Sequence, residues 1–254
     1  MIVPRFYVGF DLETTGVDPE TDRIVTGAVV HFQDGAIVKS RDWILDPGVE
    51  IPEAASNVHG ITTAVARAKG QNPIRGVAQI AGEVAYALTN DIPLVIMNAP
   101  FDLTMLDREC LRYDITPVSE ILDMFPGRQV VLDPLCLDRR ADPYRKGKRT
   151  LTDLSAHYRI QLTNAHNATA DAEAAVRITH KMLTNPPIPR GRTNYYDQVA
   201  GRPVQDLHAA QVEWFHAWAV GMERFLRRSK DPKARISPYW PMTPSTVEEI
   251  RHAA

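Results

Sequence analysis

The chain has 254 residues, of which 44% are hydrophobic and 24% charged, a composition that fits one substantial globular domain with an extension and excludes a disordered chain. Its formal net charge of -2 gives no global attraction to nucleic acid, although local basic patches can still supply one. No apolar run is long enough to cross a membrane, no signal-peptide core follows the N-terminus, and Cys110 and Cys136 are the only cysteines, so we expect no membrane contact and a reduced, cytoplasmic protein.

The first elements predict three meandering strands. Phe6–Phe10 is a short apolar run typical of a buried strand, and residues 23–32 and 36–45 alternate toward a second and a third. Asp34-Gly35 between the last two is a strong hairpin signal.

A pair of acids follows the first strand. Asp11 and Glu13 are two residues apart, so their side chains project from the same face. Two adjacent carboxylates repel one another unless cations hold them, and oxygen ligands suit Mg2+ or Mn2+. The alternative is a strand end with two solvated acids.

Two further acids lie at the starts of predicted helices. Residues 92–97 read as a strand, and Asp102 opens a helix after it. The Ala-rich residues 168–183 read as another helix, with Asp171 in its early turns and His166 just before it. An acid in a first helical turn also favours the helix dipole, and a lone histidine can be a cap or simply exposed. The remaining predicted elements are helices at 79–88 and 151–158 and a strand at 130–132.

Together these motifs resemble the DnaQ-like 3'-5' exonucleases of the DEDD superfamily. The first motif matches Asp11–Gly16, the second Asn98–Asp102, and the third, His-x4-Asp, His166–Asp171. The histidine resembles the DEDDh branch, since the tyrosine of the DEDDy branch would stand at Asn167. The resemblance covers about residues 5–183, including residues 57–62 and 133–140, and it departs from many relatives at Met97, where they carry histidine.

The resemblance implies an α/β fold, a ribonuclease H-like mixed β-sheet flanked by helices, with a C-terminal helical extension. It implies that two divalent metal ions, Mg2+ or Mn2+, are held by four acids: Asp11, Glu13, Asp102 and Asp171. His166 would be the general base toward the attacking water, because the ordinary pKa of an imidazole lies close to neutral pH.

The resemblance also implies contacts to the 3'-terminal nucleotide. The residues concerned are Leu12, Thr14, Ile61, Asn98 and Phe101, with Ile61 as an apolar wedge between the last two bases. Plain core positions for Leu12, Ile61 and Phe101, and a turn role for Thr14, are the alternatives.

The rest of the chain divides by composition. We expect an exonuclease domain at 1–184, a Pro/Gly-rich connector at 185–203 and a helical extension at 204–254. The extension contains a long helix at 204–228 with a wide apolar face, and a short helix from Pro244 to the end. The apolar face either packs on the exonuclease core or binds a separate polymerase subunit or a second copy of the chain. The basic residues among 139–149 either contact DNA or RNA or form a solvated loop.

Three functions compete on this basis. The first is a metal-dependent 3'-5' exonuclease that releases nucleoside monophosphates from single-stranded or frayed DNA, for proofreading or repair. The second is an RNA-trimming enzyme similar to ribonuclease T or oligoribonuclease. The third is a catalytically silent nucleic-acid-binding protein, which the retention of all five site residues disfavours.

Overall fold

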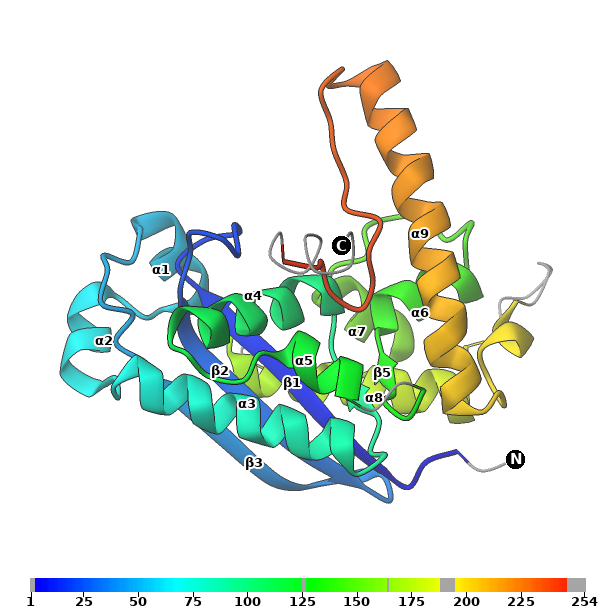
Figure 1. The fold of residues 1–254 in the computed structure, drawn as a ribbon. Helices are drawn as coiled ribbons and strands as arrows, with labels where there is room; N and C mark the ends of the chain where they lie inside the picture. The colour runs from blue at the N-terminus through cyan, green and yellow to red at the C-terminus, as the bar shows by residue number, and fades with distance from the viewer. Residues whose placement is uncertain (1–2, 125–126, 164, 188–194, 246–254) are drawn as a thin grey trace.

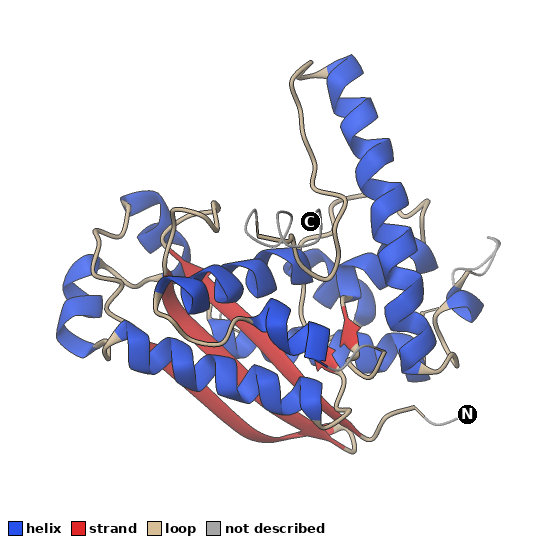
Figure 2. Ribbon diagram, in the orientation of Figure 1, coloured by secondary structure: helices blue, strands red, loops and turns tan. Residues whose placement is uncertain are grey.

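The computed structural model describes residues 3–124, 127–163, 165–187 and 195–245. A five-stranded sheet of order β3-β2-β1-β4-β5 lies between two layers of helices (Figures 1 and 2). The strands are β1 (Phe6–Thr14), β2 (Ile24–Gln33), β3 (Ala36–Ile44), β4 (Leu94–Val95) and β5 (Val131–Leu132). The first three pair antiparallel, whereas β4 and β5 run parallel to β1. This mixed sheet confirms the predicted fold class.

The hairpin between β2 and β3 forms where the sequence predicts it. Asp34 and Gly35 both have positive φ, 50° and 92°, the backbone that a tight two-residue turn requires. An ion pair of 2.6 Å between Arg5 Nε and Asp34 Oδ1 joins the turn to the start of β1.

In the described ranges, nine helical segments of at most 17 residues and one helix of 26 residues surround this sheet. Their bounds are α1 (Glu53–His59), α2 (Thr63–Lys69), α3 (Pro73–Thr89), α4 (Ala99–Arg112), α5 (Val118–Met124), α6 (Pro134–Ala141), α7 (Leu151–Tyr158), α8 (Ala168–Thr184), the 3-10 turn η1 (Tyr196–Gln198) and α9 (Val204–Ser229). The helices predicted at 151–158, 168–183 and 204–228 agree with the structure. The helix predicted at 79–88 begins earlier, at Pro73, because Asn72 accepts a hydrogen bond from Arg75 N and caps it.

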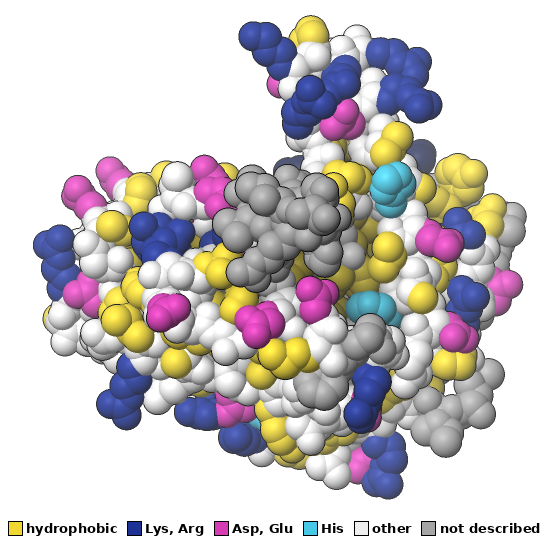
Figure 3. Space-filling view, in the orientation of Figure 1, with side chains coloured by type: hydrophobic (Ala, Val, Ile, Leu, Met, Phe, Trp, Pro, Cys, Tyr) yellow, Lys and Arg dark blue, Asp and Glu magenta, His cyan; other side chains and the backbone are white. Residues whose placement is uncertain are grey.

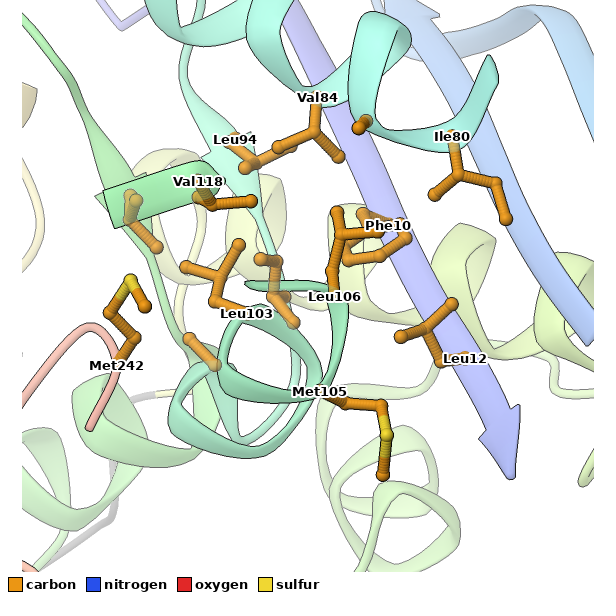
Figure 4. Close-up of a cluster of buried hydrophobic side chains, with 14 of the residues drawn as sticks. Phe10, Leu12, Ile80, Val84, Leu94, Leu103, Met105, Leu106, Val118 and Met242 are labelled. Atoms are coloured by element: carbon orange, nitrogen blue, oxygen red, sulfur yellow. The ribbon is translucent and has the colours of Figure 1, made fainter. Parts of the chain in front are cut away.

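The two faces of β1 define two cores. Phe10 and Leu12 point toward α3 and α4, where they pack with Ile80 and Leu106 (Figure 4). Tyr7 points to the opposite face and packs in a second cluster with residues of α7 and α8. Because strand side chains alternate, Asp11 and Glu13 share the α8 face with Tyr7.

A glycine allows α8 to lie close to β1. A Cβ added at Gly9 would meet Val176 Cγ2 at 2.5 Å and the backbone oxygen of Ala172 at 2.8 Å. Any larger residue at Gly9 would therefore push away α8, the helix that carries Asp171.

The first half of α9 closes the edge of the sheet. His208 Nδ1 accepts a hydrogen bond of 3.0 Å from Val131 N, and Gln211 Nε2 donates one of 3.0 Å to Val131 O. These side chains replace a sixth strand and satisfy backbone groups of the edge strand β5. The apolar face of α9 is buried as far as Ala219, so this part of the helix packs on the protein's own core.

The second half of α9 projects from the body of the molecule, and the chain then returns beside it (Figure 1). We call residues 230–245 the return segment. It places Trp240 and Met242 in the core on the α4 side of the sheet. Thr243 N donates a hydrogen bond of 2.9 Å to Thr104 Oγ1 on α4, which anchors the segment. The short helix predicted from Pro244 onward falls on residues 246–254, outside the described residues.

Candidate active site

Asp11 and Glu13 lie within β1, not beyond its end as predicted. The strand continues to Thr14, and Asp11 and Glu13 stand opposite Ala28 and Thr26 of β2. The pairing with β2 carries the strand through these two polar positions. The pleat therefore fixes both half-buried carboxylates on one face.

Asp102 joins them from α4. The strand β4 ends at Val95, opposite Gly9. Beyond this point, no described strand pairs with that edge of β1, and Leu12 N lies on it. Asp102 Oδ1 accepts a hydrogen bond of 2.9 Å from Leu12 N at this edge. This bond holds the start of α4 against β1, with Asp102 only 4% exposed.

Asp133 holds the same helix end from the other side. Its Oδ1 accepts from Asn98 N at 3.1 Å and its Oδ2 from Ala99 N at 3.2 Å, and Oδ1 also caps α6 through Leu135 N at 2.8 Å. Gln211 Oε1 in turn accepts from Asp133 N at 2.8 Å. The sequence indicated Asp133 only as part of residues 133–140, which resemble the family, and not as a site residue. Its position directly before a Pro is nevertheless a helix-start signal.

Asp171 and His166 complete the cluster from the start of α8. Asp171 Oδ2 accepts a hydrogen bond of 3.2 Å from His166 N, and His166 has φ 68°. Ligand atoms of Glu13, His166 and Asp171 all lie within 4.8 Å of one another. Within the described part of the chain, the buried Asp171 Oδ1 has no hydrogen-bond partner.

Burial raises the pKa of all four acids, and neighbouring carboxylates add to the rise for Asp11, Glu13 and Asp102. Burial, and after it the charges of Asp102, Asp171 and Glu13, raises the pKa of Asp11 well above its usual range. Burial and the charge of Asp171 raise the pKa of Glu13 to about 7. Burial also raises the pKa of Asp102 and of Asp171, although backbone hydrogen bonds oppose this effect.

This electrostatic arrangement fits divalent cations. Crowded carboxylates are costly unless positive charge compensates them, and the unpartnered Asp171 Oδ1 offers a free oxygen ligand. The cluster contains carboxylate oxygens and one imidazole, a donor set that suits Mg2+ or Mn2+.

A cleft of about 280 Å3 adjoins His166. Ile61 lines it, as do Thr26, Trp43 and His59, none of which the sequence singled out as a site residue. His59 Nδ1 accepts a hydrogen bond of 3.1 Å from Ile61 N, and burial lowers the pKa of the imidazole. The only indication of His59 in the sequence is its position within residues 57–62, which resemble the family.

The other residues predicted to contact the nucleotide differ in how far they are buried. The Leu12 side chain belongs to the core, and Thr14 Oγ1 donates a hydrogen bond of 2.6 Å to Gly16 O within the turn. Asn98 is exposed and Phe101 half-buried at the start of α4. Their contacts with a nucleotide stay predictions.

The arginines of the basic cluster at 139–149 have partners within the protein. Arg139 and Arg140 stack over Trp218 and Trp214 of α9, with the guanidinium of Arg139 3.6 Å from the ring centre. Arg145 and Arg149 both form ion pairs with the buried Asp138. These four arginines hold α6 to its neighbours, Lys146 and Lys148 are exposed, and the contact of the cluster with nucleic acid stays a prediction.

The strand order and the convergence of acids from β1, α4 and α8 define a DnaQ-like 3'-5' exonuclease with a ribonuclease H-like fold. The RNase T family model, described as exonuclease, matches residues 8–179. The chain belongs to this exonuclease family, which confirms the enzyme class that the motifs predict.

Curated relatives are PolC-type DNA polymerases III. The chain is 29% identical over 191 residues to the protein of Streptococcus mutans, covering 75% of this chain and 12% of that one. It is 30% identical over 177 residues to the protein of Listeria monocytogenes, covering 70% and 11%. The chain therefore spans only a small part of these relatives' length.

Solved structures agree in fold. The zinc-bound complex of Escherichia coli exonuclease I with single-stranded DNA has a TM-score of 0.61 at 20% identity, covering 72% of this chain and 42% of that chain. Exonuclease I of Methylocaldum szegediense has a TM-score of 0.57 at 20% identity, covering 72% and 41%. Among the described residues, no helix has the length and apolar character needed to span a membrane.

Proposed function

We propose that the chain is a metal-dependent 3'-5' exonuclease that removes nucleoside monophosphates from the end of single-stranded or frayed DNA. The observation that carries this proposal is the convergence of four carboxylates beside His166, one of them with an unpartnered buried oxygen. Two divalent ions bound there would activate the attacking water and stabilise the leaving oxygen.

Each residue has a distinct role in this proposal. Asp11, Glu13, Asp102 and Asp171 would hold the two ions, because their carboxylates supply the negative charge and the oxygen ligands that divalent cations need. Water attacks the terminal phosphorus, the bond to the 3' oxygen of the preceding nucleotide breaks, and His166 takes the proton from the water. The exposed position of His166 allows it to pass that proton on to solvent.

DNA is the favoured substrate because the relatives are DNA polymerases and exonuclease I was solved with single-stranded DNA. Proofreading or repair would be the purpose of this activity. Since the core takes up the apolar face of α9 as far as Ala219, this part of the helix is closed to a polymerase or to a second copy. The buried free thiols of Cys110 and Cys136 support a reducing, cytoplasmic location.

The test is digestion of matched 5'-labelled single-stranded DNA and RNA with Mg2+, Mn2+ or chelator. We expect a metal-dependent ladder that shortens from the 3' end, faster on DNA. Asp171→Asn removes one charge without changing shape and should abolish the ladder. Asp206→Asn, in the exposed first turn of α9, is the matched control and should cleave normally.

Three results would count against this proposal. A near-normal rate for Asp171→Asn would remove the proposed site, and faster cleavage of RNA would favour the RNA-trimming alternative. No cleavage of either strand with any metal would favour a silent binding protein.

A further inference from the structure

The projecting half of α9 and the return segment enclose a groove of about 750 Å3. Its walls include Arg224 and Arg228 on the helix and Arg235 and Tyr239 on the return segment. Since the last buried residue of α9 is Ala219 and the helix ends at Ser229, the projection is about 15 Å long. We call this feature the tip groove.

The tip groove is strongly basic in a chain that is slightly acidic. Residues 220–240 contain six Lys or Arg and only two acids. One of those acids, Glu223, is engaged, because it pairs with Arg227 at 2.9 Å and accepts a hydrogen bond of 2.9 Å from Ile236 N. The space-filling view shows the cationic side chains gathered on this projection (Figure 3).

We propose that the tip groove binds the single-stranded part of the substrate, on the 5' side of the nucleotide being removed. This inference rests on the proposed function, which supplies the strand. Arginine forks match phosphate geometry, and Tyr239, which lines the groove and is 46% exposed, offers a flat face on which a base can stack.

The inner end of the tip groove reaches the helix that carries Asp102. Thr243 lines the groove and is bonded to Thr104, two residues beyond Asp102 on α4. Arg108 of the same helix donates to Thr243 O at 3.2 Å and to Pro244 O at 2.9 Å. The groove and one of the acids are therefore fixed to the same rigid element.

Charge also decides between occupants. Two tips of equal positive charge repel one another, which disfavours a second copy of this chain. An acidic protein would match the charge, but its carboxylates would leave the exposed ring of Tyr239 among the arginines unused. A single strand of nucleic acid uses both features.

The test compares Arg224→Gln/Arg235→Gln with the matched control Lys69→Gln/Arg75→Gln. All four residues are exposed, and both variants lose the same charge. Binding of fluorescent oligo-dT of about 20 and about 4 nucleotides is measured in chelator over a range of salt. Hydrolysis of the p-nitrophenyl ester of thymidine 5'-monophosphate, which occupies only the active site, is measured with Mg2+.

We expect the groove variant to bind the long strand about 10- to 30-fold more weakly at 0.1 M salt, with a salt slope shallower by about 1.4, as for two lost phosphate contacts. Binding of the short strand and hydrolysis of the ester should match the wild type and the control. If the ester and all strands resist cleavage, the proposed function fails, while the binding comparison still tests the groove.

Unchanged affinity for the long strand, or an equal loss in the control, would overturn the proposal. So would an equal loss of binding to poly-glutamate of similar length, because the groove would then accept any polyanion.

Discussion

At the residue scale, His166 could act either as a base or as a ligand, since its ring lies within 4.8 Å of the oxygens of Glu13 and Asp171. We expect His166→Gln to lower kcat by about 10²- to 10⁴-fold, the usual contribution of a general base. The metal concentration for half-maximal activity should stay nearly constant, because the carboxylates remain. Comparable losses in kcat and in metal affinity would make His166 a ligand.

The residues of the site differ in whether the sequence alone could identify them. Asp11, Glu13, Asp102, Asp171 and His166 stand in short motifs, so the sequence could name them without a structure. Asp133 and Gln211 act through contacts between distant segments, such as the bond from Asp133 N to Gln211 Oε1. No local pattern encodes such a contact: the Asp-Pro pair at residue 133 signals only the start of α6, and no motif contains Gln211.

At the element scale, predictability depends on how local the signal is. The hairpin at Asp34-Gly35 and the helix at 151–158, which has a capping box of Thr150 and Asp153, carry their own start and stop signals. The short helices α1, α2, α5 and α6 span only about two turns, which is too little for a clear apolar period.

The close approach of α8 to β1 predicts that a methyl group added at Gly9 lowers both stability and activity. Gly9→Ala places a Cβ 2.8 Å from Ala172 O, the residue after Asp171, so α8 must move. We expect a loss of about 1–3 kcal/mol in the free energy of unfolding and a lower kcat. Gly82→Ala is the control, since a Cβ there meets no atom within 4 Å. Wild-type activity in Gly9→Ala would mean that this approach does not position Asp171.

The link from α9 to the acids predicts a distant effect on catalysis. Gln211→Leu leaves Asp133 N and Val131 O without their partners, at a cost of about 1–3 kcal/mol each. Because Asp133 holds the start of α4, kcat should fall by more than the unfolded fraction explains, and thermal unfolding measured beside kcat separates the two. Gln205→Leu, exposed on the same helix, should change neither quantity. A stability loss with normal kcat would limit Gln211 to a structural role.

At the scale of the whole molecule, the crowded acids couple stability to metal and pH. The pKa of Glu13 is raised from 4.5 to about 7 in the folded protein, so folding favours its protonated form. That contribution is complete below about pH 4.5 and is lost as the pH rises through 7. In chelator, the melting temperature of the wild type relative to Glu13→Gln should therefore fall between pH 5 and pH 8.

Divalent cations should reverse this loss, because they bind the ionised carboxylates of the folded state only. Mg2+ at about 100 times its Kd adds about 2.7 kcal/mol, which raises the melting temperature of a protein of this size by about 5–10 °C. The rise should be larger at pH 8 than at pH 5, since protons compete with the metal at the lower pH. Glu120→Gln, at an exposed glutamate of α5, should respond like the wild type. An equal rise at both pH values, or a full rise in Glu13→Gln, would show that the ions stabilise the protein at a site other than these acids.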